Sequence, residues 1–464
     1  MTPYERSSSE ASRRIEVLPS EMAGWITASQ ENVDGLGIHR SQLFALRDML
    51  DTLTLRQRDL LAHRPQPAAT GEYAESELEF TAELVGAYEL WTAFRSVFEQ
   101  RREERLVRAL DAADLVAASA YRCAIDRAVT WKVVKPNEFR EPPLVCAEAV
   151  GSPGTAARGE QVVGLTGTIR RFRDKLLPIP LVLFPADRLD DIWTYSTLAH
   201  EVGHDLEADL AFGSEAIDAG LAVLDAAGVP QDRQDAWRGW GAEVVADSVG
   251  VALAGAGFGG GLADWLLSVA LAKLFAAPNG DPHPPPHLRV RLIAGLLGGA
   301  GVAAWQPLAA ALDGDIDAAD APAWQKSFDG DAHAFAGAVI STPLTALGGH
   351  AITELSPDIS ADAALAETLA QYLRTGFNRV PTPAGPPPFP ARLVPSAAAL
   401  AVRASPAQAN LGGIARRALD YIHDIPRPAF LAAPPAGRRE FLRDLAERLD
   451  VRPPAGMTER AARW

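Results

Sequence analysis

Cysteine is nearly absent from this chain, which has only Cys123 and Cys146 among its 464 residues. A disulfide framework and a cysteine-rich zinc site both need more cysteines than this, so the sequence excludes both kinds of site. We therefore expect two reduced thiols in a reducing compartment.

Basic residues are also fewer than acidic ones. The chain has 44 Lys and Arg and 59 Asp and Glu, which gives a net charge of −15. This balance disfavours nucleic acid and anionic membrane as main partners. The most apolar window, Val249–Ala277, is interrupted by six glycines, Asp264 and Lys273. The first twenty residues show no apolar signal-peptide region. These absences predict a cytoplasmic protein without membrane insertion.

Hydrophobic residues make up 48% of the chain and charged residues 22%, which is ordinary for a folded protein. Most of the apolar residues recur every three or four positions, and this spacing predicts helices. Residues 1–35 are polar with weak periodicity, and we expect either a flexible start or a loosely docked arm there. Short β-type runs at Gln161–Thr166 and Ile179–Phe184 predict a small sheet between helical segments. Two buried helices are expected around Phe258–Gly261, which would form a turn between Gln231–Leu253 and Leu262–Ala276.

The predicted fold class is therefore α+β and predominantly helical. We divide the chain into an N-terminal helical region (1–140), a core with the small sheet (141–300) and a C-terminal helical region (301–464). The last region contains a proline-rich connector at Pro381–Pro390.

One segment carries a chemical motif: His200-Glu201-Val202-Gly203-His204, an HExxH pattern. Residues four apart share a face of a helix, so both imidazoles can reach one metal ion. Glu201 follows the first histidine, and its carboxylate can face a metal-bound water and take its proton. The motif predicts one Zn²⁺ per chain, with His200 and His204 as ligands.

A catalytic zinc usually takes three protein ligands, and no histidine stands six residues after His204. Downstream, Glu243 and Asp247 lie one helical turn apart within an apolar stretch, where two carboxylates need a partner. We expect Glu243 to be the third ligand. Asp247 would accept the N–H of a ligand histidine and so fix its orientation.

HEVGH followed by GAEVVAD resembles the gluzincin class of zinc metallopeptidases. The segment His283–Val290, HPPPHLRV, is similar to the HPxxxxR[IV] segment of the HtpX-like and CaaX-protease group, although the membrane helices of that group are missing here. The resemblance implies a zincin-like core at 141–300 and brings His283 and Arg289 near the substrate. It also implies that Ile179–Phe184 is an edge strand that pairs with a peptide, while an interior strand fits the sequence equally well.

These expectations combine into a zinc-dependent peptidase that acts on a peptide or protein substrate. Glu201 would be the general base, and the His283–Arg289 segment would stabilise the charge of the transition state. His287 and Tyr195 are alternative donors for that charge. Two other functions stay open: a zinc-stabilised scaffold or sensor that binds a partner protein, and a zinc hydrolase of a non-peptide amide. The sequence does not predict the oligomeric state.

Overall fold

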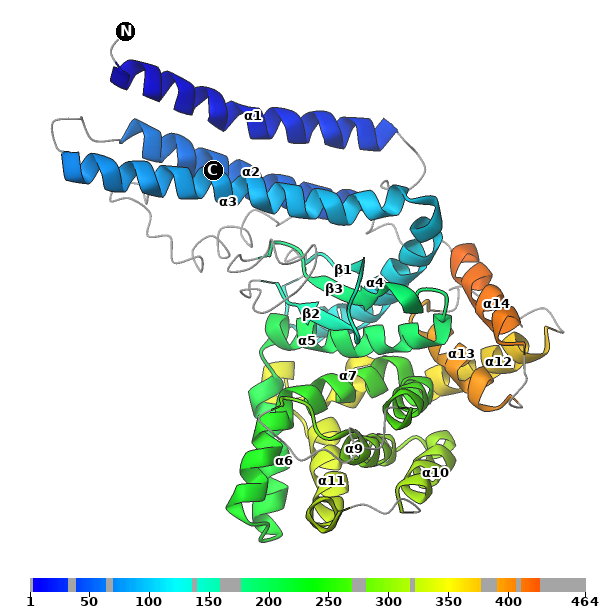
Figure 1. The fold of residues 1–464 in the computed structure, drawn as a ribbon. Coiled ribbons are helices and arrows are strands. Elements are labelled where there is room, and N and C mark those ends of the chain that lie inside the picture. The colour runs from blue at the N-terminus through cyan, green and yellow to red at the C-terminus, as the bar shows by residue number, and fades with distance from the viewer. Residues whose placement is uncertain are drawn as a thin grey trace.

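The fold was analysed in a computed structural model that describes residues 3–31, 39–63, 70–135, 140–158, 177–268, 281–317, 322–376, 390–405 and 410–425. It is mostly helical with one small sheet, which confirms the predicted class (Figure 1). The helices are α1 (Pro3–Glu31), α2 (Arg40–Ala62), α3 (Thr70–Glu99), α4 (Glu104–Thr130), α5 (Leu198–Leu210), α6 (Gly213–Ala226), α7 (Gln231–Leu267), α9 (Pro286–Gly299), α10 (Gln306–Asp317), α11 (Ala323–Ser341), α12 (Ile359–Thr375), α13 (Leu393–Arg403) and α14 (Leu411–Asp424). The strands are β1 (Leu144–Glu148), β2 (Gly154–Ala156) and β3 (Leu181–Pro185).

The sheet has the strand order β1-β3-β2, with β1 parallel to β3 and β2 antiparallel to it. Alternate residues of a strand point to opposite faces, and here both faces are buried. Leu181 and Leu183 join a hydrophobic cluster with α1, α2 and α3, whereas Val182 and Phe184 join the cluster that contains α4 and α5. The sheet therefore lies between these two groups of helices, as Figure 1 shows.

The expectation of an edge strand at Ile179–Phe184 is wrong, because β3 within this run is the inner strand of the described sheet. Hydrogen bonds to strands on both sides leave β3 no free edge for a peptide. The alternative expectation, an interior strand, is confirmed for β3. In the described sheet β2 is the edge strand next to α5.

Residues 1–35 were expected to be a flexible start or a loosely docked arm, but Pro3–Glu31 form the helix α1. The helix buries five apolar side chains spaced three or four residues apart: Ala11, Ile15, Leu18, Met22 and Trp25. Packing of this face against α2 and α3 stabilises the helix and explains the difference.

The expected turn at Phe258–Gly261 is also wrong, because these residues are helical. The break in α7 lies at Gly255, whose φ of 70° and ψ of −154° are outside the helical range. Such a conformation is open to glycine and strained for other residues. Gln161–Thr166, the end of Leu262–Ala276 and nearly all of Pro381–Pro390 lie outside the described residues.

The largest hydrophobic cluster takes residues from Ala109 to Ile422 and surrounds α7. α7 is long and apolar enough to cross a membrane by length and composition alone, and 89% of its most apolar window is buried inside the protein. In this fold α7 is the central helix, against which α5, α6, α9 and α13 pack.

Gly203, inside the HExxH motif, lies at the contact between α5 and α7. A Cβ atom built there would lie 2.9 Å from Cα of Ala246 and 3.2 Å from Cβ of Val249. Real side chains do not tolerate the first distance, so the absence of a side chain lets the two helices touch. This contact brings the histidines of α5 within reach of the carboxylates of α7.

Gly203→Ala is expected to lower the free energy of unfolding by about 1–3 kcal/mol, because α5 must move away from α7. The same shift separates the histidines from Glu243 and should weaken metal binding. Gly239→Ala is the matched control, since the added Cβ meets nothing within 4 Å. Denaturant unfolding of both variants checks this; equal stability of the two would contradict the proposed contact.

Candidate metal centre

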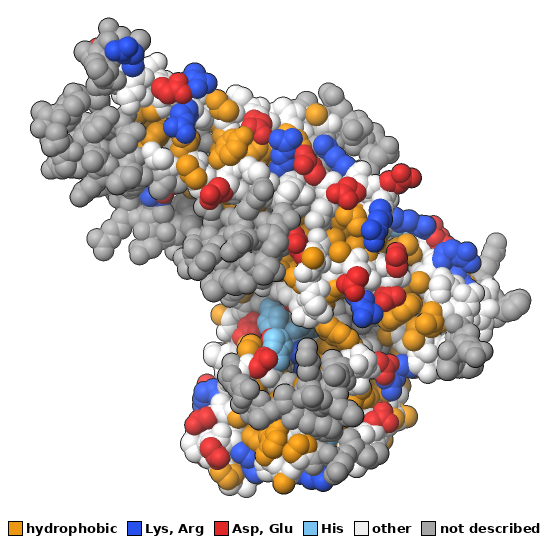
Figure 2. All heavy atoms as spheres, viewed as in Figure 1, with side chains coloured by type: hydrophobic (Ala, Val, Ile, Leu, Met, Phe, Trp, Pro, Cys, Tyr) orange, Lys and Arg blue, Asp and Glu red, His pale blue; other side chains and the backbone are white. Residues whose placement is uncertain are grey.

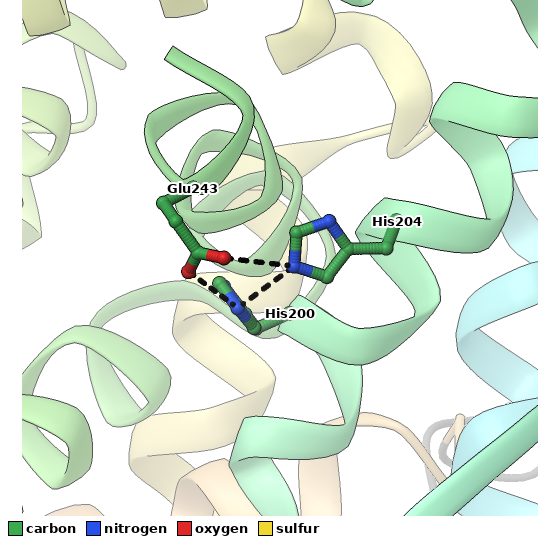
Figure 3. Close-up of side chains that lie close together, drawn as sticks. All are labelled: His200, His204 and Glu243. Carbon is green, nitrogen blue, oxygen red and sulfur yellow. Dashed lines mark hydrogen bonds and ion pairs between the residues drawn. The ribbon is translucent and has the colours of Figure 1, made fainter. Parts of the chain in front are cut away.

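His200, His204 and Glu243 form a group whose ligand atoms all lie within 4.8 Å of one another (Figure 3). Nε2 of His204 is 3.2 Å from Nε2 of His200. The Glu243 carboxylate lies 3.3 Å from Nε2 of His200 and 3.5 Å from Nε2 of His204. The contact with His200 uses Oε2 of the carboxylate and the contact with His204 uses Oε1. Donors about 2.0–2.1 Å from a tetrahedral zinc are about 3.4 Å apart, so the three side chains approach one another to the distance that such an ion requires. This group can hold a metal ion.

Two helices place these side chains. His200 and His204 are one turn apart on α5, and Glu243 faces them from α7. His200 and Glu243 are buried, whereas His204 is partly exposed. Figure 2 shows histidine side chains in a recess of the surface, between the part that holds the sheet and the part formed by α6, α9 and α11. The centre is thus mostly enclosed but open to solvent at one point.

Two of the three ligand groups, Glu243 and His204, already have the protonation state that a metal ion requires. Burial opposes ionisation of Glu243, yet His200 and Arg289 hold the pKa of its carboxyl well below the usual range. Burial and the charge of His200 lower the pKa of His204 to about 4, so its imidazole is neutral. Oε2 of Glu243 is buried and accepts no hydrogen bond of good geometry from the described residues. The Glu243 carboxylate is thus ionised and the His204 imidazole neutral, as metal ligands must be. Burial opposes protonation of His200, but Asp247 and Glu243 raise the pKa of its imidazole to about 10, so a metal ion would have to displace a proton from His200.

Asp247 lies behind His200, as the sequence predicted for the residue that orients a ligand. Its Oδ1 is 2.8 Å from Nδ1 of His200, and the side chain is fully buried. Arg289 on α9 donates two hydrogen bonds to the same carboxylate, of 2.8 and 2.9 Å. The guanidinium is also 3.2 Å from Oε2 of Glu243. Asp247 and Arg289 together therefore fix the orientation of His200 and Glu243.

Arg289 does not lie where a substrate contact was expected. It is buried, and its donors point to Asp247 and Glu243 beneath the centre. The geometry therefore favours a positioning role for Arg289 over direct contact with the substrate.

Glu201 is buried beside the two histidines, and β2 supplies its partner. The hydroxyl of Thr155 donates to Oε2 of Glu201 over 2.6 Å. Burial raises the pKa of the Glu201 carboxyl, with His200 and Thr155 opposing the rise. Glu201 is therefore held in one orientation and is a stronger base than an exposed glutamate.

His283 stands at the open side of the centre, where about half of its side chain is exposed. Its Nε2 is 3.4 Å from Oε2 of Glu243, and its Nδ1 is 2.8 Å from Oδ1 of Asp281. The alternative donors lie elsewhere. His287 is buried against α10, near the carbonyl of Ile316. Tyr195 is buried and donates to the carbonyl of Leu189. Of the three candidates, His283 is the one at the centre.

Two contributors were missed by the sequence analysis. Thr155 lies on a strand of three residues that has no recognisable pattern. Asp281 lies two residues before His283, and the sequence Asp-Pro-His could have suggested that a carboxylate orients the imidazole. Here the backbone N–H of His283 also donates to Asp281, over 2.9 Å.

Replacing Asp247 by alanine is expected to weaken zinc affinity by about 10–100-fold without removing the site. The reason is that His200 loses the acceptor that fixes its ring, while all three ligand side chains remain. Asp235→Ala, on an exposed part of the same helix, is the matched control. Competition with a chelator measures the effect, and wild-type affinity in Asp247→Ala would rule out the orienting role.

Comparisons of this chain with protein-family models, with curated proteins and with solved structures find no match.

Proposed function

We propose that this protein is a zinc-dependent peptidase with a zincin-like catalytic core. The observation that carries the proposal is the position of Glu201, a buried carboxylate held by Thr155 next to the group of His200, His204 and Glu243. A purely structural metal site has no need of an additional, uncoordinated carboxylate beside its three ligands. Two histidines and one glutamate are also a ligand set that catalytic zinc sites use.

A zinc ion held by these three side chains would supply Lewis acidity, polarising a substrate carbonyl and lowering the pKa of water. Among the protein side chains, Glu201 would act first, as the general base. Thr155 occupies Oε2, which leaves Oε1 to take a proton from the attacking water. The same carboxyl would then pass that proton to the amine that leaves when the peptide bond breaks.

His283 is suited to stabilise the negative charge that develops on the carbonyl oxygen during attack. Its ring is exposed at the open side of the centre and is oriented by Asp281. A donor aimed at the developing charge is a common device in acyl transfer. Arg289 would act through Glu243 and Asp247 by holding them in place.

An extended peptide would approach along β2, the outer strand of the described sheet and the one whose Thr155 contacts Glu201. Peptides add to free strand edges by main-chain hydrogen bonds. This arrangement supports a peptide over a small non-peptide amide as the substrate.

The test combines metal analysis of the purified protein with digestion of a mixed peptide library. We expect about one zinc per chain and new peptide termini. Zinc without cleavage, together with binding of a partner protein, would favour the scaffold or sensor. Cleavage of small amides without cleavage of any peptide would favour the non-peptide hydrolase.

A further inference from the structure

A row of acidic side chains runs along one face of α5 and meets β2 and the residues that follow this strand. Glu201, Asp205 and Asp209 stand at intervals of four residues, which places them on one face of the helix. At the first position, Glu201 accepts the hydrogen bond from Thr155 of β2. At the last position, Oδ1 of Asp209 lies 3.4 Å from Nε of Arg158, which follows β2 in the chain. The chain in and after β2 therefore contacts both ends of this acidic row.

The guanidinium of Arg158 joins several segments at once. It donates to the backbone carbonyl of Pro178 over 3.2 Å and to the backbone carbonyl of Glu141. Its Nη1 is also 3.6 Å from Oε2 of Glu141, and its Nη2 is 3.4 Å from the hydroxyl oxygen of Tyr121 on α4. Pro178 precedes β3 and Glu141 precedes β1. Arg158 therefore connects the end of β2 to the beginnings of both other strands and to two helices.

Asp209, the partner of Arg158 on α5, is itself fixed by two more side chains. The hydroxyl of Tyr121 donates to its Oδ2 over 2.5 Å. Arg140 donates to its backbone carbonyl and lies 3.3 Å from its Oδ1. No more than 6% of the side chain of Arg158, Glu141 or Asp209 is exposed. Burial opposes the charge of Arg158, but Asp209 and the other acidic neighbours raise the pKa of its guanidinium, so the group stays charged.

A buried ion cluster of this kind fixes positions more than it stabilises the fold. Apolar side chains of similar size commonly give equal or greater stability, because charged groups lose their hydration on burial. The strand β2 has particular need of such contacts. It pairs with β3 over Gly154–Ala156 alone and is an edge strand of the described sheet. A strand this short has few backbone hydrogen bonds of its own to hold it in place.

From these contacts, we propose that Arg158 is a positioning residue that fixes the edge strand β2 against α5, and with it Thr155 against Glu201. The consequence for the reaction rests on the proposed peptidase function. The peptide adds to β2 there, so Arg158 also sets the position in which the main chain of the substrate is held beside the centre.

The first variant keeps the charge and removes the directed contacts. Arg158→Lys has a single ammonium in place of the planar guanidinium, and one ammonium cannot serve all of the partners of Arg158 together. Arg238→Lys is the matched control. Arg238 lies on an exposed part of α7, 3.3 Å from Asp218, and 60% of its side chain is exposed.

Hydrogen–deuterium exchange measures the position of β2 without any turnover. We expect the amides of Gly154–Ala156 to exchange about tenfold faster or more in Arg158→Lys, because the strand opens more often. The amides of β1, Leu144–Glu148, should exchange as in the wild type and serve as the internal reference. Both strands should be unchanged in Arg238→Lys.

A double variant removes the ion pair and keeps the charge balance of the buried cluster. Arg158→Met/Asp209→Asn deletes one positive and one negative charge, so that no buried charge loses its only partner to a single substitution. It should loosen β2 in the same selective way. Arg238→Met/Asp218→Asn makes the same pair of changes on the surface and is the control.

Kinetics on a peptide that the wild type cleaves then connect β2 to the substrate. KM should rise about tenfold in Arg158→Lys and in the double variant at Arg158 and Asp209, because a looser strand binds the peptide main chain less tightly. Zinc content should stay at the wild-type value in both, since no ligand side chain is changed. The two controls should match the wild type in KM and in zinc content.

The outcomes separate the role of Arg158 from the peptidase function. Selective loosening of β2 without cleavage of any peptide by the wild type would support the role of Arg158 and reject the peptidase. Selective loosening with unchanged KM would overturn the link between Arg158 and the bound peptide. Unchanged exchange of β2, or faster exchange throughout the protein, in both Arg158 variants would overturn the positioning role, whatever the cleavage result.

Discussion

Glu201→Gln is expected to lower peptide turnover by about 10²–10⁴-fold while zinc content and fold stay intact. Glutamine has the shape of glutamate, and its amide oxygen can still accept the hydrogen bond that Thr155 donates to Oε2. It cannot take a proton from water, so only the general base is lost. Cleavage rates, zinc stoichiometry and circular dichroism of the same preparation measure the three properties.

Two further variants serve for comparison with Glu201→Gln: one is a control and the other tests the role of His283. Glu367→Gln makes the same change on an exposed position of α12 and should behave like wild type. His283→Ala should lower turnover by no more than about 10²–10³-fold, because metal and base remain in place. Undiminished cleavage by Glu201→Gln would contradict the assigned base; undiminished cleavage by His283→Ala would remove only the role proposed for His283.

Removal of a ligand is expected to have the second large effect. His204→Ala and Glu243→Ala should each lose most of the bound zinc and, with it, nearly all activity. The three side chains, whose nearest donor atoms lie 3.2–3.5 Å apart, would hold the ion together, and two of them would not retain it during dialysis. Metal analysis after extensive dialysis measures the loss.

His63→Ala is the control for this pair, since His63 is an exposed histidine directly after α2. It should keep wild-type zinc content. Full zinc retention by both His204→Ala and Glu243→Ala would show that the ion binds elsewhere and would contradict the ligand assignment.

The convergence of His200, His204 and Glu243 could be predicted from the sequence because it follows from helical geometry. The HExxH spacing places two imidazoles on one face of α5. Glu243 and Asp247 stand out because they interrupt an apolar helix, and buried carboxylates need partners. In the structure both carboxylates face His200, at 3.3 and 2.8 Å. Local periodicity and the energetics of burial were sufficient here.

Contacts that depend on the three-dimensional assembly could not be predicted. Thr155 reaches Glu201 only because β2 pairs antiparallel with β3 at the sheet edge. A strand of three residues is too short for the sequence pattern to predict it. The order of the strands likewise depends on how distant segments pair. Arg289 was placed near the substrate by resemblance, while the structure turns it toward Asp247.

The sequence of α1 contains a helical pattern of apolar residues, but other residues of the segment weaken it. Ile15, Leu18 and Met22 have helical spacing and are buried. The serine run at Ser7–Ser9 and Pro19 inside the helix weaken the pattern, since proline removes one backbone hydrogen bond. Contacts with α2 and α3 outweigh these losses, and contacts of this kind are not visible in a single segment.

The most direct test of the central claim is digestion of a peptide library by wild-type protein before chelation, after chelation, and after zinc is restored. We predict that new peptide termini appear, that they vanish when zinc is removed, and that they return with about one zinc per chain. Zinc-loaded, folded protein that generates no new termini would contradict the claim that this site hydrolyses peptides.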